Sequence, residues 1–168
     1  MQTNTIPKID MSDNPTGCCP RFHPEGWEGQ EIHFQGMKFV HARTKSLLHV
    51  PLNMGRVFGR VQEHIDTQGA ALPDGYLTLS HDRSSFSADH YFAVTKDVVG
   101  EETVTLSGDF LTKVFEGPFS EAGKWHKAME DHARAAGKEP KTVYFFYTTC
   151  PKCAGVYGKN YVVGFVEV

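Results

Sequence analysis

The chain has 168 residues, a mass of 18.8 kDa, a formal net charge of −3 and a pI near 6.3. This length suits one domain with its own core, and the near-average composition excludes collagen, coiled coil and a disordered chain. The slight acidity argues against a nucleic-acid partner, and no apolar run is long enough to cross a membrane. Because the first residues lack the apolar core of a secretory signal, we expect a cytoplasmic protein with reduced thiols.

The N-terminal stretch is polar and contains two prolines, so we expect residues 1–17 to form a flexible tail. A single domain over residues 18–168 would follow. Its first strands are predicted as a hairpin, QEIHFQG then MKFVHARTKS, because Gln35-Gly36 between them is a turn signal, although a weaker one than Asn-Gly.

Two consecutive segments then share one order of elements. The first runs from an apolar strand through Pro51 to a helix that ends at Gly69, and the second repeats this order at nearly the same spacing through Pro118. Two further strands follow each helix. We therefore predict an internal duplication, with halves at about residues 37–99 and 102–168.

Both predicted helices carry one apolar stripe at helical spacing, which includes Val61 and Ile65 in the first and Trp125 and Met129 in the second. Each half therefore offers an apolar sheet face and a helix to cover it. We predict an α+β fold in which duplicated strand–helix–strand–strand halves form an antiparallel sheet with the helices on one face. The concave surface between the halves would bind a small molecule.

The four cysteines form two tight pairs, Cys18-Cys19 and Cys150-Pro-Lys-Cys153. Two thiolates separated by two residues can ligate one tetrahedral zinc ion, and the second pair would complete the site. The side chains of adjacent cysteines diverge, so His23 is an alternative ligand beside Cys19. Such a structural zinc would fasten the N-terminal arm to the last hairpin.

Two other interpretations of the cysteines stay open. A C-x-x-C pair is also typical of thiol redox proteins, but there it opens a helix, whereas this one is predicted on a hairpin tip. The remaining interpretation is four cysteines without a shared role.

Several residues are candidates for chemistry. Glu116 ends a strand beside Phe115 and Phe119, and burial there would favour its protonated form, as in a general acid. Trp125 lies on the buried stripe of the second helix, and His126 flanks that stripe. Tyrosines are dense on the predicted strands; most of them would pack in the core, and a few would line the cleft.

The doubled layout, FEGPF at 115–119 and the TVYFFY strand resemble the gyrase-inhibitor-like (GyrI-like) superfamily of small-molecule-binding proteins, over roughly residues 30–168. The CCP at Cys18-Cys19-Pro20 and the TTCPKC…YGKNYVV end are similar to one bacterial branch, whose members are often labelled hydrolase. The resemblance implies ligand binding between the halves. In some relatives it implies hydrolysis of reactive ring compounds by an acidic residue and an aromatic hydroxyl.

One position departs from the family pattern. The family often has a glutamate two residues before a tyrosine on the strand after the second helix, and Thr142 stands there, before Tyr144. The nearest substitutes as catalytic residues are Glu116 and Tyr147. The candidate ligand-binding residues are Trp125, His126, Tyr144 and Tyr76.

We therefore expect a protein that binds a hydrophobic or aromatic small molecule, and hydrolysis of this compound stays open. One alternative is a non-enzymatic binding or sensor module with a structural zinc on Cys18, Cys19, Cys150 and Cys153; a thiol redox protein is a weaker one. Neither nucleic acid nor a membrane is an expected partner, and monomer and dimer both stay open.

Overall fold

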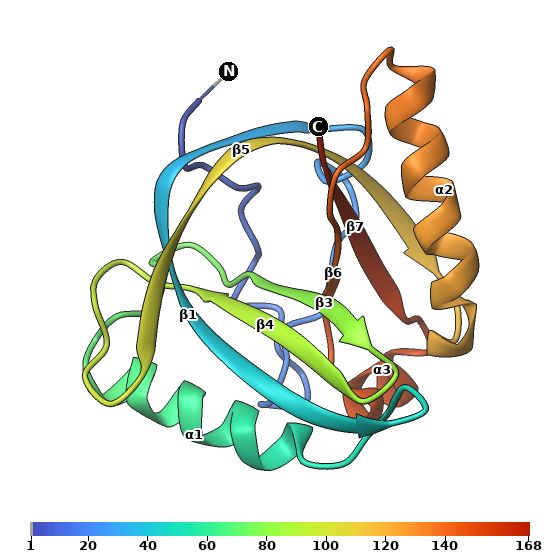
Figure 1. The fold of residues 1–168 in the computed structure, drawn as a ribbon. Helices are drawn as coiled ribbons and strands as arrows, with labels where there is room; N and C mark the ends of the chain where they lie inside the picture. The colour runs from blue at the N-terminus through green and yellow to red at the C-terminus, as the bar shows by residue number, and fades with distance from the viewer. Residues whose placement is uncertain (1) are drawn as a thin grey trace.

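The computed structural model describes residues 2–168, in which seven strands form one sheet and three α-helices accompany it (Figure 1). The strands are β1 Glu31–Leu47, β2 Val50–Pro51, β3 Thr78–Ser84, β4 Ser87–Ala93, β5 Glu102–Glu116, β6 Val143–Tyr147 and β7 Tyr161–Glu167. The helices are α1 Met54–Thr67, α2 Ala122–Ala135 and α3 Pro151–Tyr157. None of the helices within residues 2–168 is long and apolar enough to cross a membrane.

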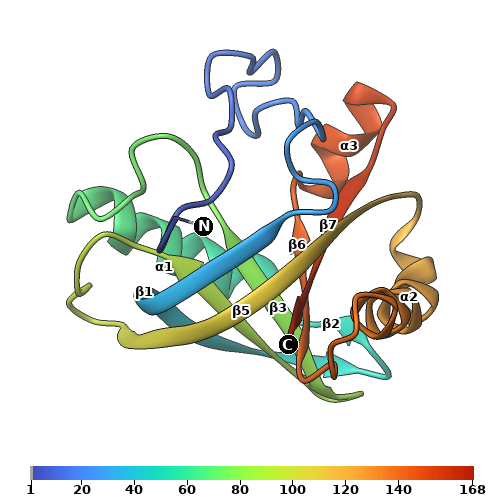
Figure 2. The same ribbon diagram turned by 90° about the horizontal axis from the view of Figure 1, so that it is seen from above.

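The sheet is antiparallel throughout, in the order β2-β1-β4-β3-β6-β7-β5. The long strands β1 and β5 also pair with each other, from Glu31 opposite Leu111 to His41 opposite Glu102. This pairing joins the two sides of the sheet into a barrel-like arrangement (Figures 1 and 2). The predicted α+β fold is therefore confirmed, with the order strand, helix, strand, strand in each half.

The predicted hairpin around Gln35-Gly36 is wrong. Both segments belong to β1, which runs through this point with a β-bulge between Phe34 and Met37. Gly36 has a φ of +62°, a left-handed conformation that a bulge and a tight turn both require of glycine. Because β5 pairs with β1 on both sides of the bulge, the chain bends there instead of reversing.

Helices α1 and α2 each cover the outer face of their own half. Helix α1 buries Val57, Val61 and Ile65 in a cluster with Val40 and Phe92. Helix α2 buries its own stripe against the outer face of β5, β6 and β7; that cluster contains Trp125, Met129, Ala133, Leu111, Phe145 and Val166. The inner face of the sheet is thus left for a separate core.

That inner core is aromatic and includes the N-terminal segment, residues 2–29. Phe22 and Trp27 of this segment pack with Phe146 of β6 and Phe165 of β7. Trp27 is only 1% exposed, and its ring centroid lies 5.4 Å from that of Phe146. In Figure 2 the segment lies at the top of the view, on the same side as α3.

The first part of this segment, expected as a flexible tail, also contacts the barrel. The amide of Asn4 donates a hydrogen bond to the carbonyl of His33, and the amide of Ile9 donates one to the carbonyl of Asp74. The Ile9 side chain is buried in the inner core.

Candidate functional site

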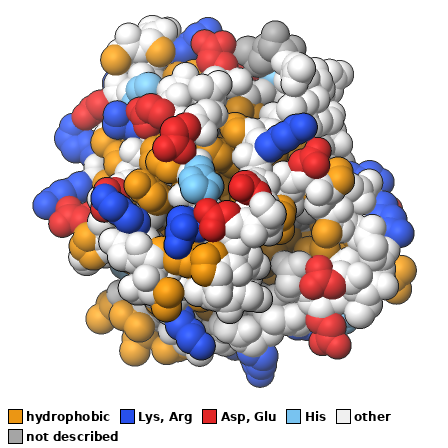
Figure 3. Space-filling model, turned by 180° about the vertical axis from the view of Figure 1, so that it is seen from behind, with side chains coloured by type: hydrophobic (Ala, Val, Ile, Leu, Met, Phe, Trp, Pro, Cys, Tyr) orange, Lys and Arg blue, Asp and Glu red, His pale blue; other side chains and the backbone are white. Residues whose placement is uncertain are grey.

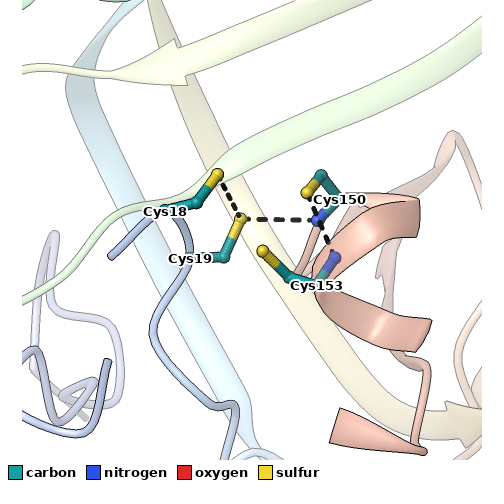
Figure 4. Close-up of side chains that lie close together, drawn as sticks. All are labelled: Cys18, Cys19, Cys150 and Cys153. Carbon is teal, nitrogen blue, oxygen red and sulfur yellow. Dashed lines mark hydrogen bonds between the residues drawn. The ribbon is translucent and has the colours of Figure 1, made fainter. Parts of the chain in front are cut away.

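The four cysteines meet at one place. Their sulfur atoms lie within 4.8 Å of one another, two of them on the N-terminal segment and two at the start of α3 (Figure 4). The Sγ atoms of Cys18 and Cys19 are 3.7 Å apart. A tetrahedral zinc ion with Zn–S bonds of about 2.3 Å separates its sulfur ligands by about 3.8 Å. The cluster therefore fits a four-sulfur metal site, and the predicted meeting of the two cysteine pairs is confirmed.

The adjacent cysteines do not diverge as expected. The chain turns just before them at Gly17, with a φ of +70°, and the Cys18 amide donates to the Thr16 hydroxyl at 3.2 Å. This turn brings the Cys18 and Cys19 sulfurs to one side. The imidazole of His23, the alternative ligand, instead lies 2.8 Å from a carboxylate oxygen of Asp13.

The C-x-x-C motif opens a helix, which corrects the predicted hairpin tip. Cys150 caps α3, and its sulfur accepts a hydrogen bond from the amide of Cys153 at 3.5 Å. Pro151 suits the first helical turn, and Gly158 ends the helix with a φ of +73°. The sequence objection to a redox pair, the lack of a helix after the motif, is thereby removed.

Two of the thiols differ in acidity. The hydroxyl of Thr16, 3.3 Å from the sulfur of Cys153, lowers the pKa of this thiol to about 7. Burial raises the pKa of Cys19 above its ordinary value. Thiolates are the form that binds metals, so Cys153 is prepared for ligation near neutral pH, whereas Cys19 needs the charge of a cation to lose its proton.

Two tyrosines donate hydrogen bonds to backbone carbonyls in and next to the cysteine cluster. The hydroxyl of Tyr157 donates to the carbonyl of Cys19, and the Arg21 guanidinium lies over the Tyr157 ring, 5.1 Å from its centroid. The hydroxyl of Tyr76 donates to the carbonyl of Thr148, next to the C-x-x-C motif, and burial raises its pKa. Tyr76 therefore positions the chain before the cluster.

A small cavity lies beside the cluster, between the N-terminal segment and the second half. It has a volume of about 190 Å³, and its lining includes Phe22, His23, Thr149, Tyr157 and Tyr161.

Figure 3 shows the molecule from behind, the side on which the N-terminal segment lies in Figure 2. Hydrophobic, acidic, basic and histidine side chains are mixed on this face.

A second group of polar residues lies on the inner face of the sheet, around Asp89 of β4. Its carboxylate, with a side chain only 10% exposed, contacts His41 at 2.8 Å, Arg43 at 3.1 Å and Arg83 at 3.3 Å. Burial alone would raise the pKa of Asp89, but the hydrogen bonds from His41 and Arg43 lower it below its usual value. Asp89 is therefore a carboxylate at neutral pH.

Aromatic rings stand next to this carboxylate. Tyr91 is two residues along β4, on the same face as Asp89, and its ring meets Tyr144 edge-on at 5.9 Å. The rings of His81 and Tyr144 are 5.8 Å apart. Sequence reasoning missed Asp89, although the alternation His41-x-Arg43 on one strand and His81-x-Arg83 on another was a usable signal once the strand order was known.

Residues 9–168 match the family model described as Bacterial hydrolase. The chain belongs to this bacterial hydrolase family. The family description agrees with the branch that the CCP and CPKC motifs indicate. A comparison with curated proteins finds no match.

Solved structures are similar to this family member at low sequence identity. A hydrolase from Listeria innocua is 14% identical with a TM-score of 0.55, over 84% of this chain and 91% of that one. A structure of SAV2435 bound to tetraphenylphosphonium is 15% identical with a TM-score of 0.49, over 84% of this chain and 93% of that one. At this identity, the Listeria structure shows a common fold.

In this hydrolase-family chain, the structure does not bring Glu116 and Tyr147 together. Tyr147 packs edge-on against Phe119 on the outer face, 5.2 Å between centroids, and burial raises its pKa to about 12. Glu116 follows Phe115, another outer-face residue, so strand alternation directs it to the other face. There it pairs with Lys159 at 3.4 Å and is half-exposed.

The remaining predicted residues lie in three different places. Trp125 is buried under α2, where it stacks on Phe115 at 5.4 Å. His126 is exposed on the same helix and contacts Glu130 at 3.2 Å. Tyr144, in contrast, lies on the inner face beside the Asp89 group.

Proposed function

We propose that the protein binds one zinc ion through Cys18, Cys19, Cys150 and Cys153, and that this ion is structural. The observation that supports it is the convergence of four sulfur atoms within 4.8 Å. Four thiolates fill the tetrahedral shell of zinc and leave no position for a water molecule, as in structural sites. The ion would cross-link the N-terminal segment to the start of α3.

Metal analysis of the purified protein tests this proposal. One equivalent of zinc is expected in the wild type and in His23→Ala, which removes the alternative ligand. Cys19→Ser and Cys150→Ser are expected to lose most of it. If zinc stays bound in Cys19→Ser but is lost in His23→Ala, His23 and not Cys19 is a zinc ligand. A protein that takes up no zinc after refolding with an excess of zinc would refute the site.

We also propose that the protein binds a small molecule and that its family belongs to the GyrI-like superfamily. The ligand is a hydrophobic or aromatic compound held on the inner face, where Tyr91 and Tyr144 offer rings and Asp89 offers a charged group. These residues combine an acidic group with aromatic hydroxyls on one face. Glu116 and Tyr147, on opposite faces, do not.

Hydrolysis would then depend on Asp89 rather than Glu116. The activity assay uses p-nitrophenyl acetate as a generic ester. We expect Asp89→Asn to lose most of the turnover, and Glu116→Gln, a carboxylate paired only at the surface with Lys159, to retain it. If Glu116→Gln loses turnover and Asp89→Asn retains it, Glu116 is the catalytic carboxylate. If the wild type hydrolyses the ester no faster than Asp89→Asn does, the protein binds its ligand without hydrolysing it.

A thiol redox function is the second candidate, because Cys150-Pro-Lys-Cys153 opens α3. Insulin reduction by dithiothreitol, accelerated by the protein and not by Cys150→Ser, would support it. The zinc proposal predicts no acceleration by the zinc-loaded protein.

A further inference from the structure

The middle of the N-terminal segment, residues 10–26, contributes to the inner core without pairing with the sheet. Residues 10–26 contain no helix or strand, yet Phe22 is buried and lies 6.1 Å from Phe146, centroid to centroid. Trp27 follows and fills the space between Phe146 and Phe165. Aromatic side chains from a segment without regular structure thus form part of the core between the two halves.

The polar attachments of this stretch are concentrated at one point. Within the described chain, backbone hydrogen bonds from residues 10–26 to other backbone groups stay inside the segment, for example from Arg21 to Asp13. Its polar side-chain contacts with the rest of the described protein all go to the start of α3 or to Tyr157. Apart from apolar packing, the cysteine cluster and Tyr157 are therefore the attachments of this stretch. Trp27, which follows it, is held separately, because its carbonyl accepts a hydrogen bond from the hydroxyl of Thr112.

Two cavities lie beside the segment, with volumes of about 190 Å³ and about 340 Å³, and Phe22 and His23 line both of them. Small-molecule sites have about 300–1,000 Å³, so one cavity is below this range and the other is at its lower end. The rings that face Phe22 and Trp27 are those of Phe146, Tyr161 and Phe165. A larger planar aromatic ligand would find suitable walls there only where the segment has moved away.

We propose that residues 10–26 form a plug latched by the cysteine-bound metal, and that loss of the metal frees the plug and opens an aromatic site on the inner face. The proposal rests on the proposed zinc site. An unstructured stretch of this length gains conformational entropy on release, which opposes the burial of Phe22. Release of the plug would uncover the Trp27 ring, whose centroid lies 5.6 Å from that of Phe22. The metal cross-link favours the state in which the segment is packed in the core. Segments with few backbone hydrogen bonds are the first to open when such a constraint is lost.

The sequence provides an internal reporter, because Trp27 and Trp125 are its two tryptophans. Trp125→Phe leaves Trp27 as the emitter, and Trp27→Phe is the matched control. The experiment strips zinc from the full-length Trp125→Phe protein with a chelator. It then records tryptophan emission, the fluorescence of added 8-anilinonaphthalene-1-sulfonate, and far-ultraviolet circular dichroism.

On zinc removal, we expect Trp27 emission to shift to the red and dye fluorescence to rise at least severalfold, with unchanged circular dichroism. Returning zinc should reverse both signals, and Trp27→Phe should show the dye response without the emission shift. Unchanged Trp27 emission after verified zinc loss overturns the latch alone. Loss of the circular dichroism also overturns it, because the ion would then hold the whole domain. A protein that never takes up zinc overturns the proposed site as well.

Discussion

The backbone amide of Cys150 donates a hydrogen bond of 3.5 Å to the sulfur of Cys19, 131 positions earlier in the chain. This contact joins the N-terminal segment to the start of α3 (Figure 4). It places one cysteine pair against the other before any ion is considered. A metal bound there would close a long loop of the chain.

Zinc should stabilise the protein through these cysteines. At a free zinc concentration 100 times the dissociation constant, a ligand that binds only the folded state raises the free energy of unfolding by about 2.7 kcal/mol. We expect an increment of this size in urea unfolding of the wild type and its absence in Cys153→Ser. An equal increment in the variant would show that zinc binds elsewhere.

Truncation of Trp27 should be strongly destabilising. Its side chain is 1% exposed and packs on Phe146 and Phe165, and aromatic-to-alanine changes in cores cost about 3–5 kcal/mol. We expect Trp27→Ala to lower the free energy of unfolding by this amount. His126→Ala, exposed on α2, should stay within about 0.5 kcal/mol of the wild type. A loss below about 1 kcal/mol in Trp27→Ala would contradict the packing of the segment.

His90 should make the protein sensitive to acid. Burial lowers the pKa of His90 from 6.5 to about 4, and its ring nitrogens lie 2.7 Å from the Ser80 hydroxyl and 2.8 Å from that of Thr44. Between these two pKa values the unfolded state binds more protons than the folded state. The stabilisation is therefore complete above pH 6.5 and is lost as the pH falls to about 4.

The difference between the two pKa values corresponds to about 3 kcal/mol. Urea unfolding of His90→Gln should lack this part of the pH dependence between pH 7 and pH 4. His126→Gln, a surface control, should keep the wild-type slope. Parallel pH profiles for the wild type and His90→Gln would mean that His90 titrates normally.

Local patterns predicted the repeated part of the fold well. The apolar stripes of the two helices and the succession of strand, helix, strand and strand along the chain are features of short stretches, and the structure confirms them. The two cysteine pairs could also be matched, because four thiolates complete one tetrahedral zinc site.

Other features depended on contacts that no short pattern contains. Glycine at position 36 suits both a turn and a bulge, and only pairing with β5 on both sides decides for the bulge. Asp89 stands opposite Arg43 of β1 and His81 of β3 because β4 lies between these two strands in the sheet. The sequence leaves this spatial order open. The burial of Phe22 and Trp27 likewise results from closure of the barrel around them.

X-ray absorption at the zinc edge of the purified protein tests the central claim most directly. A four-cysteine site predicts a shell of four sulfur atoms at about 2.3 Å from zinc. In Cys18→Ser, one of these sulfur atoms should be replaced by a lighter atom or the zinc should be lost. A wild-type shell with nitrogen or oxygen ligands at about 2.0–2.1 Å would contradict the claim, because His23 or water would then complete the site.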